Sequence, residues 1–432
     1  MPNTPSFPLS QASRAGSPQP INELIALALA DPSIISLAAG LVDYKTLPVE
    51  IVSAHSPGIL EKHGQAALQY GVTGGLPALQ REIFLHLSRL EEAAGHKLEH
   101  CGPAQVVVTT GSQQLLHILA EILLDRGDIV VTCWPSYFVY TQALASFGAV
   151  PRSVDMDEHG IIPERLEALL AELHAAGQLP RVKMAYLVTY HQNPTGITLC
   201  AQRKPVILEI IKHYSALAGH RIVIVEDAAY RELAFSGEPG ATPPSFRAFD
   251  KTGEHTVIAQ TFSKPFAPGV KTGYGLLPLA LVGPVMQAKG GRDFGSSNLC
   301  QHLLASVMAN GDFDAHVKRL KAAYAAKGAA VVCALEKHFA GVQGVSWSRP
   351  AGGMYVWLTL PAGADTGPGS AFLKAAMDEK VIYVPGVFCF PADPARTAPV
   401  NTIRLAYGVT DPAQAAEGVR RLRAAWKKVS GE

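Results

Sequence analysis

The sequence has no excess of charge of either sign. Lys and Arg number 37 and Asp and Glu number 36, so the 432 residues carry a formal net charge of +1. Proteins that bind nucleic acid or an anionic membrane through surface charge normally show a clustered basic excess. The balance therefore predicts that the protein has no nucleic-acid partner.

Long apolar runs are absent as well. A membrane-spanning helix needs about 20 consecutive apolar residues, and the longest runs of this sequence are far shorter. Residues 1–20 are rich in Pro and Ser and lack the apolar core of a secretory signal, so we interpret them as an arm with little regular structure. The sequence thus predicts no membrane partner.

Paired cysteines and the common metal and nucleotide motifs are also missing. The six cysteines are scattered without a C-x-x-C pair, which in a long chain favours reduced thiols and a cytoplasmic location over a disulfide framework. No H-E-x-x-H motif or Cys/His cluster indicates a metal site. No G-x-x-x-x-G-K-[ST] motif is present, and no G-x-G-x-x-G motif follows a strand, so the usual nucleotide chemistry is not expected.

What the sequence has is an alternation of apolar runs and helical patterns between about residues 105 and 280. Near-continuous apolar strands separated by helices predict a mostly parallel sheet covered on both faces, the doubly wound α/β architecture. The expected strands are 106–110, 129–133, 183–190, 221–227, 256–262 and 273–278.

After about residue 297 the pattern indicates a smaller α+β domain. A long helical stretch is followed by shorter strands and helices. We predict a large domain at 46–300, a small domain at 301–432, and an N-terminal segment at 1–45 that packs on the small domain. The expected elements are helices at 21–30, 298–340, 370–380 and 412–428 and strands at 352–361, 381–388 and 401–408.

Polar residues stand where the strands of the large domain end. In open α/β sheets, ligands bind just beyond the carboxyl ends of the strands. The first strand is followed by a Gly-Ser pair that opens a helix, and free N–H groups at a helix start bind phosphate. Taken alone, Ser112 is better explained as an ordinary helix cap. The other strand ends carry Tyr137, Asn193 in HQNPTG, Asp227 with Tyr230, and Ser263 with Lys264.

Each of these residues has a simpler explanation by itself: an Asp caps a helix, a Tyr packs in a core, and a Lys faces water. Together they place a phosphate cradle, an aromatic ring, an amide, a carboxylate, a phenol and an amine around one sheet edge. Pyridoxal phosphate (PLP) needs all of these groups, because its aldehyde reacts with a lysine and its pyridine nitrogen needs a carboxylate to stay protonated. We therefore predict PLP as the cofactor.

The order and wording of these motifs resemble the fold-type I, PLP-dependent class I/II aminotransferases over nearly the whole chain. The likeness is greatest to the branch with the 2-aminoadipate (LysN-type) and kynurenine aminotransferases. It implies transfer of an amino group from an L-amino acid to a 2-oxo acid, with 2-oxoglutarate as the expected acceptor, in a homodimer with shared active sites. The motifs are LQYGVTGGLPALQ (68–80), TTGSQQ (109–114), QNPTG (192–196), VEDAAYRELAF (225–235), FSKPFAPGVKTGYG (262–275), RPAGGMYVWLTLP (349–361) and NTIRLAYG (401–408).

The resemblance also implies a role for each candidate residue. Lys264 would hold the cofactor as an internal aldimine and then move a proton between the substrate Cα and the cofactor. Asp227 would pair with the pyridinium nitrogen, and Asn193 and Tyr230 would bind the 3-oxygen of the ring. The phosphate and ring would be held by the backbone amides of Ser112 and Gln113, by Ser263 and Lys271, and by Tyr137 stacked on the ring.

The remaining implied roles concern the substrate and a second subunit. Arg404 would clamp the substrate α-carboxylate in a bidentate fork that a lysine could not reproduce. Gly40 and Asn193 would also contact the substrate, and Tyr70 would reach the phosphate of the neighbouring subunit.

The sequence departs from the family pattern at three positions. Position 271 usually holds arginine, and Lys271 supplies charge without the guanidinium fork. Arg292 stands where relatives commonly have a small residue near the phosphate, so it is either a partial replacement for that guanidinium or a plain surface arginine. Asn22 stands where the 2-aminoadipate branch often has an arginine that reads acidic side chains, which favours a donor with a neutral side chain.

Three other functions share part of this pattern. A β-lyase, decarboxylase or cyclising synthase on the same scaffold uses the same early chemistry, so the motifs do not separate it from an aminotransferase. A transcriptional regulator with a DNA-binding head is disfavoured because only about 20 residues precede the first predicted helix. A catalytically inactive binding protein is disfavoured by Lys264, Asp227, Asn193 and Arg404, although Lys271 keeps that alternative open.

Overall fold

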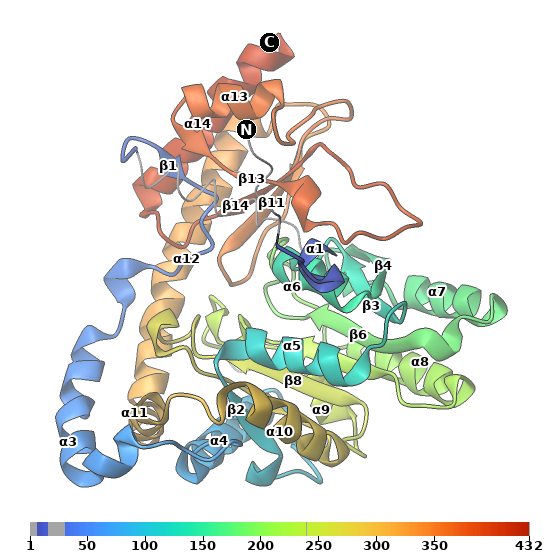
Figure 1. Ribbon diagram of the computed structural model, residues 1–432. Helices are drawn as coiled ribbons and strands as arrows, with labels where there is room; N and C mark the ends of the chain where they lie inside the picture. The colour runs from blue at the N-terminus through green and yellow to red at the C-terminus, as the bar shows by residue number, and fades with distance from the viewer. Residues whose placement is uncertain (1–6, 16–30, 239, 432) are drawn as a thin grey trace.

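The computed structural model describes residues 7–15, 31–238 and 240–431, and its main feature is an eight-stranded sheet (Figure 1). Its strands are β2 (Val106–Thr109), β3 (Ile129–Trp134), β4 (Val150–Asp157), β5 (Gly160–Ile161), β6 (Val182–Val188), β7 (Val223–Asp227), β8 (Thr256–Thr261) and β9 (Gly273–Leu276). They lie in the order β2-β9-β8-β7-β6-β3-β4-β5. The pairs β3–β4, β3–β6, β6–β7 and β7–β8 are parallel, whereas β9 is antiparallel to β2 and β8, and β5 is antiparallel to β4. The predicted α/β class with a mostly parallel sheet is confirmed.

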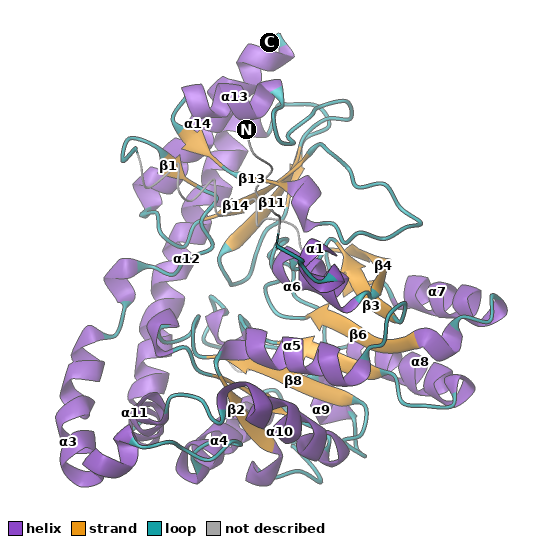
Figure 2. Cartoon of the chain, viewed as in Figure 1, coloured by secondary structure: helices purple, strands orange, loops and turns teal. Residues whose placement is uncertain are grey.

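Helices cover both faces of this sheet (Figure 2). One face packs against α5 (Gly111–Leu123), α6 (Phe138–Leu144) and α10 (Leu279–Asp293). The other face packs against two groups of helices. These are α7 (Pro163–Ala175), α8 (Arg203–Ala218) and α9 (Phe246–Phe249) over β3, β6 and β7, and α3 (Val49–Leu68), α4 (Pro77–Ala93) and α11 (Asn298–Ala309) over β2, β8 and β9.

A second, smaller sheet is antiparallel and has its own core. Its order is β10-β11-β14-β13, and three helices pack with it in one hydrophobic cluster. The strands are β10 (Ser346–Trp347), β11 (Tyr355–Thr359), β13 (Val384–Pro385) and β14 (Thr402–Ala406), and the helices are α12 (Asp312–Phe339), α13 (Ala371–Asp378) and α14 (Pro412–Ser430). Near the N-terminus, β1 (Ile35–Ser36) pairs in parallel with β12 (Val381–Ile382).

Helix α12 connects the two parts of the molecule (Figure 1). Its first turns contribute Phe313 and Val317 to the core beneath the large sheet, whereas Leu335 and Phe339 near its end belong to the core of the small sheet. Because one helix contributes to both cores, the packing has no sharp division there. The domain boundaries predicted from the sequence stay predictions.

The structure differs from the expectations in a few elements. Strand β4 was not predicted, because its polar and charged positions break the apolar pattern. The helix expected at 298–340 is two helices, separated at Gly311, whose positive φ of 81° is a conformation that glycine adopts without steric cost. A short helix, α1 (Gln11–Ala15), lies in the arm that was expected to have little regular structure. The helix expected at 21–30, with Asn22, lies outside the described residues.

The described residues contain neither a membrane-spanning helix nor a disulfide. Across residues 7–15, 31–238 and 240–431, no helix has the length and apolar character needed to cross a membrane. All six cysteines are free thiols.

Candidate active site

Nine of the predicted site residues line one cavity of about 270 Å³ at the carboxyl edge of the large sheet. Thr110, Gly111, Val188, Ala229, Thr261 and Pro268 complete its lining. A larger cavity of about 760 Å³ lies among α3, α4 and α11 and contains none of the predicted residues. The nine are Ser112, Gln113, Tyr137, Asn193, Asp227, Tyr230, Ser263, Lys264 and Lys271.

Strand direction explains why these residues meet. The parallel strands β3, β6, β7 and β8 end at the same edge, and the site residues follow those ends. Strand β9 runs the other way, so the residues just before it reach the same edge. Lys271 stands there at the end of the short 3-10 helix η6 (Pro268–Val270), with a positive φ of 46°. The reversed strand therefore adds a cation to an edge that the parallel strands build.

Lys264 lies at the centre of the site. Its Nζ donates a hydrogen bond to the backbone oxygen of Gly40 at 2.9 Å and lies 5.9 Å from the centre of the Tyr230 ring. Gly40 has no room for a side chain, since a Cβ there would lie 2.7 Å from the hydroxyl of Tyr355. The amine thus projects into the cavity from the turn that follows β8 and touches the segment that follows β1.

Asp227 is a buried carboxylate without an ion-pair partner in the described part of the chain. Its Oδ2 accepts a hydrogen bond from the Tyr186 hydroxyl at 2.7 Å and its Oδ1 accepts one from the Ala229 N–H at 3.2 Å. Burial raises the pKa of the Asp227 carboxyl, and the two hydrogen bonds oppose that rise only in part. A buried carboxylate in this state gains stability from a cationic partner.

The opposite end of the cavity is built to hold an anion. Helix α5 begins at Gly111, and its first N–H groups are free of intrahelical partners. The backbone of Gly273 packs against this helix start so closely that a Cβ would lie 2.5 Å from the Ser112 nitrogen. Ser263 accepts a hydrogen bond from the Thr261 hydroxyl at 3.0 Å, and Lys271 adds the positive charge.

Arg404 forms a third functional centre, next to the cavity. It lies on β14 and is 1% exposed. Its Nη1 donates to Asn193 Oδ1 at 3.1 Å and its Nη2 donates to the Ala38 oxygen at 2.6 Å, while its buried Nε has no hydrogen-bond partner among the described residues. The guanidinium also lies 4.8 Å from the centre of the Tyr355 ring. These contacts hold Arg404 in one orientation, and its Nε–H can still donate a hydrogen bond to a ligand.

The segment that follows β1 runs through the centre of this site. The Leu37 N–H donates to Ile382 and the Leu37 oxygen accepts from the Ala406 N–H, which fixes the segment between two strands of the smaller part. The oxygen of Ala38 then meets Arg404, and the oxygen of Gly40 meets Lys264. Two of these four hydrogen bonds hold the N-terminal segment on the smaller part, and the other two join it to Arg404 and Lys264 on the two sides of the site.

The comparisons with known proteins agree with this geometry. Residues 32–422 match the family described as aminotransferase class I and II. The chain belongs to the class I and II aminotransferases.

Relatives of this aminotransferase include both members of the branch that its motifs resemble. It is 32% identical over 402 residues to aromatic-amino-acid aminotransferase 1 of Thermococcus litoralis, covering 93% of this chain and 90% of the relative. It is 32% identical over 398 residues to the 2-aminoadipate transaminase of Thermus thermophilus, covering 92% and 91%. The kynurenine aminotransferase of Pyrococcus horikoshii, solved in complex with PMP, has a TM-score of 0.87 at 30% identity over 97% of each chain. The fold-type I architecture and the transaminase activity follow.

The aminotransferase uses pyridoxal phosphate, and the residues of the cavity fit that cofactor. Asp227 is a buried carboxylate with no cationic partner among residues 7–15, 31–238 and 240–431, as a site for a pyridinium requires. The start of α5, with Lys271, suits a phosphate. The roles of the individual residues stay predictions.

Besides Gly40 and Arg404, which bond to the lining residues Lys264 and Asn193, two other residues singled out in the sequence lie outside the cavity. Tyr70 is 84% exposed, and its ring centre lies 6.2 Å from that of Phe294. Arg292 forms an ion pair with Glu121 on α5, ten residues beyond Gly111 and so roughly 15 Å along the helix from its start. Within its own chain the guanidinium of Arg292 is therefore engaged away from the start of α5, and the hypothesis that Arg292 replaces part of the guanidinium missing at position 271 stays a prediction.

Sequence reasoning missed two tyrosines that complete the site. Tyr186 donates to Asp227 from the middle of β6. Tyr355 on β11 hydrogen bonds with the Tyr230 hydroxyl at 3.0 Å and accepts from Asn193 Nδ2 at 3.4 Å. Both stand inside apolar strands, where a tyrosine is normally a core residue, although Tyr355 lies in one of the quoted family motifs.

Proposed function

We propose that Lys264 is the catalytic acid–base of this aminotransferase and that Asp227 and Arg404 hold the two reactants on either side of it. The observation that carries the proposal is the arrangement of an amine, an unpaired buried carboxylate and a buried guanidinium around one cavity. Pyridoxal phosphate supplies an aldehyde and a pyridinium ring that withdraws electrons from the substrate Cα. Nζ of Lys264 would take the proton from that Cα and deliver it to the cofactor, and would move it in the opposite direction in the second half of the cycle.

The other side chains bind and orient. The Asp227 carboxylate favours a protonated ring nitrogen, because a charge in this buried place needs an opposite charge. The start of α5, Ser263 and Lys271 anchor the phosphate. Arg404 binds the α-carboxylate of the amino acid and, in the second half of the cycle, that of the 2-oxo acid.

We propose a donor with a neutral, preferably aromatic, side chain. Trp357 lies directly opposite Arg404 in the β11–β14 register, and the Phe138 ring centre lies 5.4 Å from the guanidinium. Arg396, which stacks 4.5 Å from the centre of the Trp134 ring, is already ion-paired with Asp155. Similarity to an aromatic-amino-acid aminotransferase supports the same choice.

The visible spectrum of the purified protein tests these roles. The wild type should be yellow, lose its colour with phenylalanine, and regain it with 2-oxoglutarate as the expected acceptor. Lys264→Ala should bind the cofactor without turning over. The proposal on the donor is refuted if 2-aminoadipate bleaches the protein with a much larger kcat/KM than phenylalanine. Release of ammonia or carbon dioxide without return of colour would indicate a lyase or decarboxylase instead.

We further propose a homodimer in which Tyr70 completes the site of the neighbouring subunit. Tyr70 is part of an exposed apolar group with Leu68, Val72 and Phe294, which are 70%, 62% and 72% exposed. Such a group on the surface of a chain is typical of an interface.

Mixing two inactive variants tests the shared site. In a hybrid of Tyr70→Ala and Lys264→Ala chains, one site has both residues intact and the other has neither. Refolding the two variants together should restore activity up to about a quarter of the wild type, because half of the random dimers are hybrids and each holds one intact site. Activity no higher than that of the separate variants refutes the sharing.

The cytoplasmic location is also a proposal, supported by the six free thiols. Subcellular fractionation with activity in the soluble cytoplasmic fraction is the expected result. Recovery in an oxidising compartment would contradict it.

A further inference from the structure

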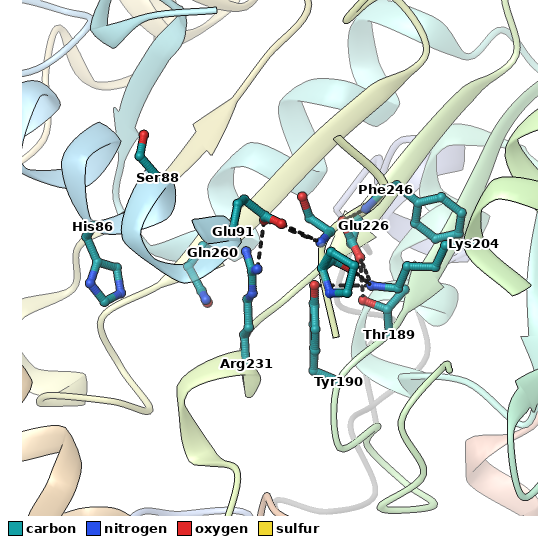
Figure 3. Close-up of polar contacts among 12 residues, drawn as sticks. His86, Ser88, Glu91, Thr189, Tyr190, Lys204, Glu226, Arg231, Phe246 and Gln260 are labelled. Atoms are coloured by element: carbon teal, nitrogen blue, oxygen red, sulfur yellow. Dashed lines mark hydrogen bonds and ion pairs between the residues drawn. The ribbon is translucent and has the colours of Figure 1, made fainter. Parts of the chain in front are cut away.

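Behind the strand end that carries Asp227, four charged side chains are completely buried. Lys204 on α8 and Glu226 on β7 form one ion pair, Nζ to Oε1 at 2.8 Å, and both side chains are 0% exposed. Arg231 and Glu91 on α4 form a second, Nη2 to Oε1 at 2.7 Å, and are also 0% exposed. Figure 3 shows both pairs in one view. The proposed chemistry uses none of these four groups directly.

Buried ion pairs are a poor route to stability. The cost of removing two charges from water often exceeds their attraction, and well-packed apolar residues of similar volume are frequently as stable. The Lys204–Glu226 pair therefore calls for another explanation, and its hydrogen bonds supply one.

Lys204 uses all three N–H donors of its ammonium group. Besides Glu226, its Nζ donates to the Tyr190 hydroxyl at 3.1 Å and to the Pro244 oxygen at 2.7 Å. The Tyr190 ring also lies beneath the ammonium, with 4.2 Å between Nζ and the ring centre. One side chain from α8 thus ties together the end of β7, the loop after β6 and the segment before α9 (Figure 3).

Glu226 passes this restraint to the catalytic edge. Its Oε1 accepts from the Thr189 hydroxyl at 2.9 Å, and its Oε2 accepts from the Phe246 N–H at 2.8 Å. The Thr189 N–H in turn donates to the oxygen of Asp227 at 3.3 Å. Because successive strand residues point to opposite faces, a side chain fixed at 226 on one face sets the direction of the Asp227 side chain on the other.

We propose that Lys204 is a positioning residue for transamination. By holding Glu226 and Tyr190 behind the sheet, it keeps Asp227 and Asn193 at the distance from each other that the cofactor ring requires. The inference rests on the proposed roles of Asp227 and Asn193. It assigns to Lys204 no contact with substrate or cofactor.

The test compares Lys204→Met, which keeps the length of the side chain without its charge, with Lys212→Met on the same helix. Lys212 is a matched control, because its side chain is 28% exposed and, in the part of the chain that the structure describes, pairs only with Glu209, whose side chain is 72% exposed. Three quantities are measured on the holoenzyme: the melting temperature, the pH midpoint of the visible absorbance band of the bound cofactor, and kcat with KM. Lys204→Met should shift the midpoint and lower kcat roughly 10- to 100-fold, as a displacement of about 1 Å in a reacting group does. Lys212→Met should match the wild type in all three.

A double variant separates positioning from charge burial. Lys204→Met combined with Glu226→Gln removes the buried carboxylate that the single variant leaves unpaired, so the melting temperature of the double variant should recover. Its absorbance midpoint and kcat should stay changed, because the contacts of Lys204 with Glu226, Tyr190 and Pro244 are still lost. If the double variant has the wild-type midpoint and kcat, Lys204 has only a structural role and the proposal is overturned. This outcome remains decisive even if the single variant does not fold.

Asp227→Asn distinguishes failure of this inference from failure of the proposed function. A shifted midpoint in Asp227→Asn and an unshifted one in folded Lys204→Met overturns the role of Lys204 alone. An unshifted midpoint in Asp227→Asn overturns the role of Asp227, and the positioning role of Lys204 falls with it.

Discussion

Replacing Arg404 by lysine keeps the positive charge at the substrate end of the site and removes the planar fork of N–H donors. In the structure, Nη1 and Nη2 already bond to Asn193 and Ala38, at 3.1 Å and 2.6 Å, and the buried Nε has no hydrogen-bond partner in the described ranges. A single lysine ammonium at this position could not bond to Asn193, Ala38 and the substrate carboxylate at the same time. At least one charge-assisted hydrogen bond to the carboxylate is then lost.

The size of the fall in kcat/KM follows from the number of hydrogen bonds that the substitution removes. A hydrogen bond to a charged group contributes about 1.5–3 kcal/mol. Since about 1.4 kcal/mol corresponds to a factor of ten, kcat/KM for the amino acid should fall about 10- to 150-fold in Arg404→Lys. The affinity for the cofactor should change little, because Arg404 does not line the cofactor cavity.

Stopped-flow measurement of the loss of cofactor colour gives kcat/KM for the first half-reaction directly. Arg396→Lys is the matched control, since this arginine pairs with Asp155 and stacks on Trp134 and has no proposed contact with the substrate carboxylate, so kcat/KM should stay near the wild type. The reasoning is refuted if Arg404→Lys stays within about threefold of the wild type. The reasoning is equally refuted if kcat/KM of Arg404→Lys falls by the same factor for an amine that has no carboxylate.

Three further predictions concern the cofactor cavity and stability. Lys271→Met should raise the Kd for pyridoxal phosphate about 10- to 150-fold in a fluorescence titration, for the loss of one charged contact, while Lys271→Arg should bind at least as tightly as the wild type. Gly273→Ala should abolish cofactor binding in the same titration, because the new Cβ would lie 2.5 Å from the Ser112 nitrogen, whereas Gly269→Ala, with nothing within 4 Å, should bind normally. Burial lowers the pKa of His191 to about 4, so its contribution to stability is complete above pH 6.5 and is lost as the pH falls toward 4. Between pH 7.5 and pH 5 the wild type should therefore lose about 2 kcal/mol more unfolding free energy than His191→Asn, measured by denaturant titration, and equal losses would contradict the burial of a neutral imidazole.

The apolar strands made most of the large sheet predictable. The runs that end in Asp227 and Ser263 are continuous, so both the strands and the residues beyond them could be placed from sequence. Strand β4 could not, because VPRSVDMD alternates and carries charge along its length. The direction of β9 was equally hidden, since an apolar run reads the same in either direction.

The strand pattern made the candidate site predictable where a residue ends or follows a strand, whereas Arg404, within β14, was found only through the family resemblance. Tyr186 and Tyr355 occupy strand positions that a core tyrosine fills equally well, so only their distances from Asp227 and Tyr230 reveal them. Glu226 left a signal, namely a carboxylate inside the run RIVIVED, but its partner Lys204 is 22 residues away on a helix. Long-range pairing of this kind is a property of packing, which no local pattern contains.

The passage of the N-terminal segment through the active site has a practical consequence. Ile35 and Leu37 pack in the core of the small sheet, and the backbone oxygens of Ala38 and Gly40, just beyond them, accept hydrogen bonds from Arg404 and Lys264. Because Leu37, Ala38 and Ala39 are buried, a protease reaches this segment only when it opens locally, and a cut there would break the chain beside the backbone oxygens that Arg404 and Lys264 contact. A substrate bound between Arg404 and Lys264 would shield the segment, so the rate of cleavage would report occupancy of the site. Shortening the chain from its N-terminus past Ser36 would remove part of the active site rather than a dispensable tail.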